Sequence, residues 1–163
     1  MIKKICIIGS GSWGSALAIH AAKMGHEVKL WSFSEEERDL INKEHKCKFL
    51  PMATMPENIV CTTNLEEAVK GSDMILHVTP SKFTRETVKK YKMYVENQPI
   101  ILCSKGFEAS TLYTLEEVVH EEMPSAKIGV FTGPSHAEEV SLGIPTAIVI
   151  ASQSLDVQYL VQD

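Results

Sequence analysis

The sequence predicts an α/β fold in which a doubly wound, mainly parallel sheet carries helices on both faces. Seven short apolar runs rich in Ile and Val recur along the 163 residues, and segments with helical periodicity separate them. Because these runs are continuously apolar rather than alternating, they indicate strands buried on both faces. Strands that alternate with helices favour right-handed crossovers, and hence a doubly wound sheet.

The expected strands are all short, as is typical of such sheets. They cover Ile5–Ile8, Glu27–Trp31, Ile59–Thr62, Met74–Val78, Ile100–Cys103, Ile128–Phe131 and Ala147–Ile150. In open sheets of this kind, ligands bind beyond the carboxyl ends of the strands, near the point where the strand order reverses. We therefore expect the functional site among the loops that follow the strands.

Helix signals occupy the segments between the expected strands. Apolar residues recur at spacings of three and four over residues 12–24, and Gly25 follows as a stop, which predicts a helix with one buried face. Asn64 followed by Glu67 predicts a capping box, in which each side chain bonds the other residue's backbone N–H. Further helices are expected over 34–45, 64–71, 81–94 and 110–122, and near residue 135.

Composition and charge exclude several classes of protein. The 16 Lys and Arg against 21 Asp and Glu give a net charge of -5, which disfavours a nucleic-acid partner. No apolar stretch approaches the roughly 20 residues of a membrane-spanning helix, and no secretory signal opens the chain. The four cysteines form no C-x-x-C pair and predict reduced thiols in a cytoplasmic protein. No residues have metal-ligand spacing or form a nucleophile–base pair, so we assign neither a metal nor a catalytic residue.

A glycine-rich turn directly follows the first expected strand and opens the first helix, with the sequence Gly9-Ser10-Gly11-Ser12-Trp13-Gly14. In such a G-x-G-x-x-G turn, Gly9 allows the tight bend and Gly11 leaves room for a pyrophosphate, whereas Gly14 lets the helix pack close to the sheet. The start of the helix adds unpaired N–H groups and a partial positive charge. The turn therefore predicts a Rossmann-type fold that binds a dinucleotide.

The end of the second expected strand bears on the choice between NAD and NADP. It reads Trp31-Ser32-Phe33-Ser34-Glu35, with neither a carboxylate directly at the strand end nor an Arg. Phe33 is a candidate to lie against adenine, and the acidic run from Glu35 would repel a 2′-phosphate. The same acidic run also fits an ordinary solvated helix start. The sequence thus favours NAD and leaves NADP open.

The loops after the fifth and sixth expected strands carry further candidates. Lys105 is a lone cation whose partner is either a ligand oxygen or, as an alternative, Glu108 in a surface ion pair. Gly133 permits close backbone approach, and Ser135 offers a hydroxyl and an N–H group at a helix start, although these residues fit an ordinary helix start equally well. His136 stays open between a functional group and local packing or capping.

Several stretches together resemble the NAD(P)-dependent glycerol-3-phosphate dehydrogenases. They are the glycine turn continued to Ala18, Phe49 to Ile59, Thr79 to Ser81, Ser104 to Glu108 and Gly133 to Val140. The resemblance implies reversible hydride transfer between a reduced nicotinamide and dihydroxyacetone phosphate, which gives sn-glycerol 3-phosphate for glycerophospholipid synthesis. It also implies the following contacts: Ser12, Trp13, Phe33, Ser34, Phe83 and Ala137 with the cofactor, Gly133 and Ser135 with the substrate, and Lys105 with both.

Two domains are expected in the complete protein. Residues 1–150 would form the dinucleotide-binding domain, and 151–163 would begin a linker or helix leading to a helical substrate domain absent from this chain. The segment after Ile150 is typical of a helix start, and no Lys or Arg occurs after Lys127. The resemblance places the principal acid/base, a lysine, in that second domain and implies a homodimer. We therefore expect this chain to bind nucleotide without turnover.

Two rival functions remain open at this point. Another Rossmann-type hydroxyacid or sugar-phosphate dehydrogenase would share the glycine turn but not the Gly133-Pro134-Ser135 stretch. A non-catalytic module that senses nucleotide would also bind a dinucleotide, and it would lack a lysine in the continuation of the chain.

Overall fold

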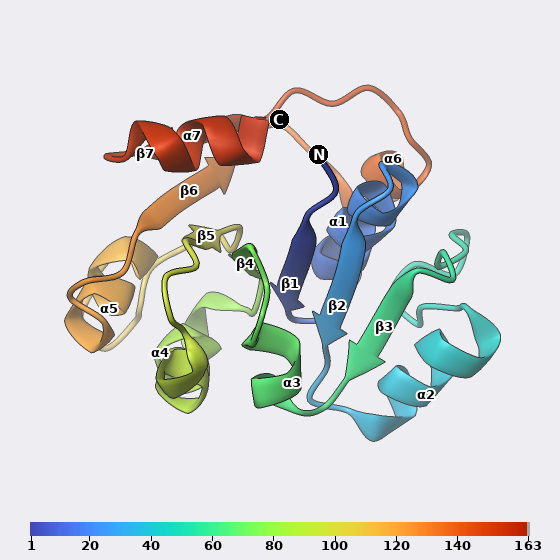
Figure 1. Cartoon of the computed structure of the whole chain (residues 1–163), viewed down its shortest axis with the longest axis horizontal. Helices are drawn as coiled ribbons and strands as arrows, with labels where there is room; N and C mark the ends of the chain where they lie inside the picture. The colour runs from blue at the N-terminus through green and yellow to red at the C-terminus, as the bar shows by residue number, and fades with distance from the viewer. Residues whose placement is uncertain (163) are drawn as a thin grey trace.

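Seven strands form one sheet in the computed structural model, which describes residues 1–162 (Figure 1). They are β1 (Lys4–Ile8), β2 (Glu27–Trp31), β3 (Ile59–Thr62), β4 (Met74–His77), β5 (Ile100–Leu102), β6 (Ile128–Thr132) and β7 (Val149–Ser152). Their order is β3-β2-β1-β4-β5-β6-β7, and all neighbours are parallel except β6 and β7. The prediction of a doubly wound, mainly parallel sheet is confirmed.

Seven α-helices connect or follow these strands in the described part of the chain. They are α1 (Ser12–Lys23), α2 (Glu35–Glu44), α3 (Leu65–Val69), α4 (Thr84–Tyr91), α5 (Leu115–Glu122), α6 (Ala137–Ser141) and α7 (Leu155–Gln162). The helix expected over 81–94 consists of α4 between two 3₁₀ turns, η1 (Ser81–Phe83) and η2 (Lys92–Tyr94). The helix expected from Ser110 begins only at Leu115, because Leu112 has a φ of 61° and breaks the regular backbone before it.

The expected capping box at α3 is only half present. The Asn64 side chain accepts hydrogen bonds from the backbone N–H groups of Glu66 and Glu67, as an N-cap should. The Glu67 carboxylate does not accept a hydrogen bond from the Asn64 backbone N–H, because it accepts from the Thr62 hydroxyl at 2.8 Å instead. A complete capping box occurs at α5, between Thr114 and Glu117.

The sheet separates two apolar cores, one on each face. The first contains Ile7 of β1 with residues of α1, α2, α6 and α7, and the second contains Ile8 with residues of α3, α4 and α5 (Figure 1). Neighbouring side chains of β1 are thus buried on opposite faces, which explains the continuous apolar run. Each fully buried Val, Leu or Ile contributes about 1.5–3 kcal/mol to stability.

Burial on both faces was predicted for every strand, and this is wrong for β2 and for both edge strands. In β2, Glu27 and Lys29 are exposed, and Val60 of the edge strand β3 is 49% exposed. The last strand covers 149–152 rather than 147–150, and its Val149 is 62% exposed. As an antiparallel edge strand it pairs with β6 alone, so one of its faces can meet water.

The predicted domain boundary after residue 150 stays a prediction. Here β7 crosses that position, and α7 buries Val157 in the first core beside Gly129. The last residue of the predicted linker, Asp163, lies outside the described residues. No helix within residues 1–162 has both the length and the apolar character to cross a membrane.

Candidate functional site

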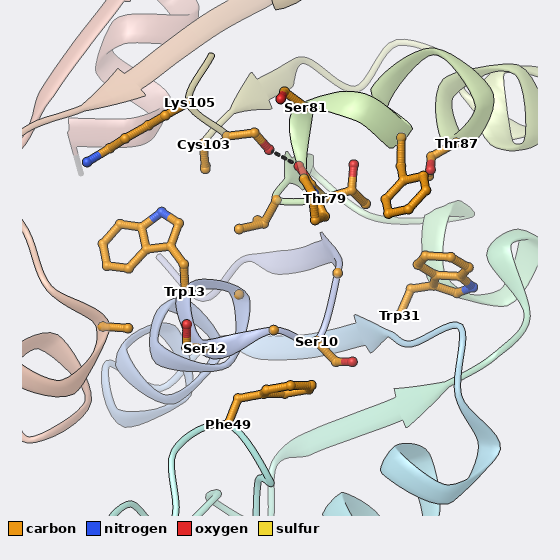
Figure 2. Close-up of a pocket in the computed structure, with 18 of the residues that line it drawn as sticks. Ser10, Ser12, Trp13, Trp31, Phe49, Thr79, Ser81, Thr87, Cys103 and Lys105 are labelled. Carbon is orange, nitrogen blue, oxygen red and sulfur yellow. Dashed lines mark hydrogen bonds between the residues drawn. The ribbon is translucent and has the colours of Figure 1, made fainter. Parts of the chain in front are cut away.

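A pocket of about 880 Å³ opens at the carboxyl edge of the sheet, where the strand order reverses between β1 and β4. The loops after β1, β4 and β5 and the start of α6 form most of its wall. Figure 2 shows Thr79 across the pocket from Ser10 and Ser12, with Trp13 and Lys105 toward one end and Trp31 toward the other. The topology predicted a site at this edge.

The glycine turn has the geometry that a phosphate-binding turn requires. Gly9 has a φ of +121°, and a β-carbon there would lie 3.1 Å from the carbonyl carbon of Val78. At Gly11, a β-carbon would meet nothing within 4 Å, so this side of the turn is open. Because Gly11 caps α1 without a side-chain hydrogen bond, the first N–H groups of the helix remain available to an anion.

A buried pair of serines joins the glycine turn to the end of β2. The Ser10 hydroxyl donates to Ser32 Oγ at 2.8 Å, and Ser32 Oγ also accepts from the backbone N–H of Ser34 at 3.2 Å. Ser32 is fully buried by these contacts, whereas Phe33 is 85% exposed at the pocket rim. Ser34 itself does not line the pocket, because its side chain caps α2 by accepting from the Glu37 N–H.

The loops after β4 and β5 are held together by Ser104. Its hydroxyl donates to the Thr79 carbonyl oxygen at 2.5 Å and approaches the His77 carbonyl oxygen at 3.3 Å. Lys105 follows directly and lines the pocket as an exposed side chain. Cys103 lines it as well, and burial raises the pKa of its thiol, so that it stays protonated and is no nucleophile.

The alternative ion pair between Lys105 and Glu108 is wrong. Glu108 instead takes a bidentate contact from Arg85, at 2.7 Å from Nε and 2.8 Å from Nη2. The Arg85 guanidinium lowers the pKa of Glu108 to about 2, with help from the Thr111 hydroxyl. No ion pair of the described residues includes Lys105.

Of the two predicted substrate residues in the turn before α6, only one lines the pocket. Ser135, His136 and Ala137 line the pocket, whereas Gly133 does not. A β-carbon on Gly133 would lie 2.7 Å from the Ala147 carbonyl oxygen, so its close backbone approach serves packing against the segment before β7. His136 is the N-cap residue of α6 but makes no side-chain capping bond there.

The structure thus gathers ten of the twelve predicted contact residues around one pocket. They are Gly9, Gly11, Ser12, Trp13, Gly14, Phe33, Phe83, Lys105, Ser135 and Ala137. Whether each one contacts a ligand stays a prediction. Within residues 1–162, no group of three or more His, Cys, Asp and Glu side chains is placed to hold a metal ion.

Several lining residues were not predicted as contacts, although some carried a usable signal. Cys103, Ser104 and Thr79 follow strands directly, and the spacing of Glu86 and Lys90 places them one turn apart on α4. Phe49 opens a stretch that resembles the family, but no strand end or helix spacing marked it as a contact, because it reaches the pocket from the irregular segment between α2 and β3 (Figure 2).

Comparison with known proteins shows the family of this chain. Residues 4–158 match the family model described as NAD-dependent glycerol-3-phosphate dehydrogenase N-terminus. The chain is 40% identical to the glycerol-3-phosphate dehydrogenase [NAD(P)+] of Agathobacter rectalis and 41% identical to that of Fusobacterium nucleatum, covering 99% and 98% of this chain. In both cases the chain spans about half of the relative, 49% of its length.

Solved structures agree with these matches. The glycerol-3-phosphate dehydrogenase of Coxiella burnetii superposes with a TM-score of 0.93 at 31% identity, over 98% of this chain and 50% of that one. A GDP-mannose dehydrogenase of Pseudomonas aeruginosa superposes with a TM-score of 0.79 at 15% identity, over 99% of this chain and 43% of that one, which shows a shared fold alone. The chain therefore belongs to the family of the N-terminal part of NAD-dependent glycerol-3-phosphate dehydrogenase.

Proposed function

We propose that this chain is the cofactor-binding part of an NAD(P)-dependent sn-glycerol-3-phosphate dehydrogenase. The complete enzyme would reversibly reduce dihydroxyacetone phosphate to sn-glycerol 3-phosphate for glycerophospholipid synthesis. The observation that carries this proposal is the placement of the glycine turn and Lys105 around one pocket at the reversal of strand order. The names of the related proteins supply the substrate.

The pocket fits a dinucleotide at its phosphate-binding turn. The open side of Gly11 and the first N–H groups of α1 would receive the pyrophosphate. Phe33 and Phe83, both exposed at the rim, would offer aromatic faces to adenine, while Trp13 and Ala137 would border the rest of the cofactor. When bound, the nicotinamide supplies or accepts the hydride.

Lys105 would contact both the cofactor and the substrate. An ammonium group that no carboxylate of the described chain neutralises would attract a phosphate or the carbonyl oxygen of the substrate. Its charge would also favour the negative charge that develops on that oxygen during reduction. Ser135 would contribute a hydroxyl and an N–H group, whereas Gly133 would act by packing the loop. We assign no proton donor to this chain, so we expect binding without turnover.

The cofactor choice, the assembly and the compartment belong to the same proposal. We favour NAD over NADP, because Glu35 is exposed beside the end of β2 and would repel a 2′-phosphate. A homodimer of the complete enzyme rests on the family resemblance alone. A cytoplasmic location is supported by the four cysteines, which are all free thiols.

Fluorescence titration of the chain with NADH and, separately, NADPH tests this proposal. The two tryptophans, Trp13 and Trp31, both line the pocket, so bound nicotinamide should quench them saturably. We expect tighter binding of NADH than of NADPH, and no oxidation of NADH when dihydroxyacetone phosphate is added. If neither nucleotide quenches the fluorescence, the proposed function is wrong. Turnover by the chain alone would overturn the assignment of the proton donor to another part of the enzyme.

A further inference from the structure

A buried histidine lies directly behind the wall of the pocket. His77 ends β4 with no exposed surface, and it is not among the residues that line the pocket. Its Nε2 is 2.8 Å from the Thr79 hydroxyl oxygen, and its Nδ1 is 3.2 Å from the Tyr91 hydroxyl oxygen. The three side chains thus form one hydrogen-bonded line from α4 to the pocket.

The charge state of this histidine follows from its surroundings. Burial lowers the pKa of His77 to about 4, and its ring nitrogens face two neutral hydroxyl groups. The ring is therefore neutral near pH 7, with one nitrogen that donates a hydrogen bond and one that accepts. The nitrogen that carries the proton determines which group donates in each of the two hydrogen bonds.

The hydrogen bond of the Tyr91 hydroxyl decides which nitrogen of His77 carries the proton. Its side chain is fully buried, and burial raises the pKa of its phenol, so the hydroxyl keeps its hydrogen. His77 Nδ1 is the hydrogen-bond partner of this hydroxyl among the described residues. If Nδ1 carried the proton, the Tyr91 hydrogen would be buried without an acceptor, which is strongly disfavoured. Tyr91 therefore donates to Nδ1, and Nε2 carries the proton.

The Nε2–H group then donates to the Thr79 hydroxyl oxygen and occupies its role as acceptor. The hydrogen of that hydroxyl has no acceptor from residues 1–162. Thr79 is only 5% exposed, but unlike Tyr91 it lines the pocket, so its hydroxyl hydrogen remains available to a group bound there. Thr79 lines the pocket, and its backbone nitrogen lies 3.3 Å from where a β-carbon on Gly9 would stand. The backbone of the residue that carries this donor is therefore next to the glycine turn, and Figure 2 shows Thr79 on the wall opposite Ser10 and Ser12.

We propose that Thr79 donates a hydrogen bond to a phosphate or ribose oxygen of the bound dinucleotide, and that His77 is the positioning residue that keeps this donor available. The inference rests on the proposed function, since it requires that a dinucleotide occupies the pocket. Tyr91 acts one step further back, by fixing the tautomer of His77.

The tautomer is measurable in the chain without any ligand. Long-range ¹H–¹⁵N correlation spectra of the imidazole rings distinguish a protonated Nε2 from a protonated Nδ1, and the signals missing in His77→Gln identify the residue. We expect only the Nε2–H form of His77 in the native chain, and loss of this single form in Tyr91→Phe. A protonated Nδ1 in the native chain would overturn the proposal whatever the chain binds.

The donor is tested by a matched pair of variants in the NADH titration. Thr79→Val keeps the shape of the side chain but lacks the hydroxyl, and it should weaken NADH binding by about 3- to 10-fold. Thr79→Ser restores the hydroxyl and should bind within about twofold of the native chain. If native and Thr79→Val chains bind equally well, Thr79 donates nothing and the inference alone fails. If the native chain binds no NADH, the proposed function fails first.

Discussion

Gly14 packs against the carbonyl oxygen of Gly9 so closely that a β-carbon on Gly14 would stand 1.9 Å from that oxygen. Both partners are backbone groups, so no flexible side chain can move aside. The first turn of α1 is thereby pressed onto the end of β1, which fixes the turn between them. Gly11 lies in the same turn with open space beside it. Gly14 thus allows close packing, whereas Gly11 leaves room for a ligand.

Gly14→Ala should destabilise the fold. The added methyl group must displace the Gly9 carbonyl or shift α1, and overpacking of this kind costs about 3 kcal/mol, far more than the gain in helix propensity. Unfolding by urea measures the loss as a lower midpoint. An alanine variant with native stability would show that α1 can move freely from the sheet.

Gly11→Ala is the matched substitution that should cost no more than about 1 kcal/mol, the usual loss when alanine replaces an N-cap residue, because its β-carbon meets no protein atom within 4 Å. The methyl group would instead project into the open side of the turn. We expect NADH binding to weaken by at least about tenfold, as read from tryptophan quenching. Unchanged affinity would mean that the pyrophosphate does not approach this turn.

Lys105→Met tests the cation of the pocket. It should not change the unfolding midpoint, because no protein carboxylate loses its partner. Loss of a charged contact should weaken NADH binding by about tenfold. Lys127→Met removes the same charge just before β6, at the opposite edge of the sheet, and serves as the control. An equal loss in both variants would indicate a general effect of net charge.

Arg85→Met should destabilise the contact between α4, α5 and the loop after β5. Arg85 bonds Glu108, Glu121 and Glu122, and the side chains of Glu108 and Glu122 are only 14% and 10% exposed. The variant leaves partly buried like charges near one another and should cost about 2 kcal/mol in urea unfolding. The exposed pair of Lys43 and Asp39 offers a comparison, since Lys43→Met should cost less than about 0.5 kcal/mol.

Acid should weaken the fold through His77 at a pH where Glu108 still contributes fully. The folded pKa of His77 is about 4, below its ordinary value of 6.5, so below pH 6.5 the unfolded chain binds a proton that the folded chain does not. The stability from His77 is complete above pH 6.5 and is lost as the pH falls toward 4, on the order of 3 kcal/mol in all.

Urea unfolding of native chain and His77→Gln at pH 6.5 and pH 4.5 isolates this contribution. The folded pKa of Glu108 is about 2, so its stabilising effect is lost only between pH 4.5 and pH 2, outside this range. The free energy of unfolding should fall more steeply with acid in the native chain than in the variant. Parallel slopes would show that His77 does not become charged on unfolding.

Local patterns in the sequence were enough to predict the sheet, the glycine turn and most of the pocket wall. The central strands β1, β4 and β5 each contain an apolar run, and the glycines that shape the turn lie within six consecutive residues. Edge strands were harder, because the apolar run near Val149 does not reveal that one face meets water. A contact such as that between His77 and Tyr91 joins different elements, and neither residue signals the other in the sequence.

The pocket is built from residues far apart in the sequence, so it can form only late in folding. Its wall draws on residues from Gly9 to Glu138, and β1 pairs with β4 across a connection of more than sixty residues. Such non-local pairing requires long loops to close first, which makes folding slow compared with helical proteins of similar size. A growing chain on the ribosome therefore cannot use NADH as a folding aid until nearly all of these residues have emerged. The nucleotide can stabilise only the finished fold, by mass action on the folded state.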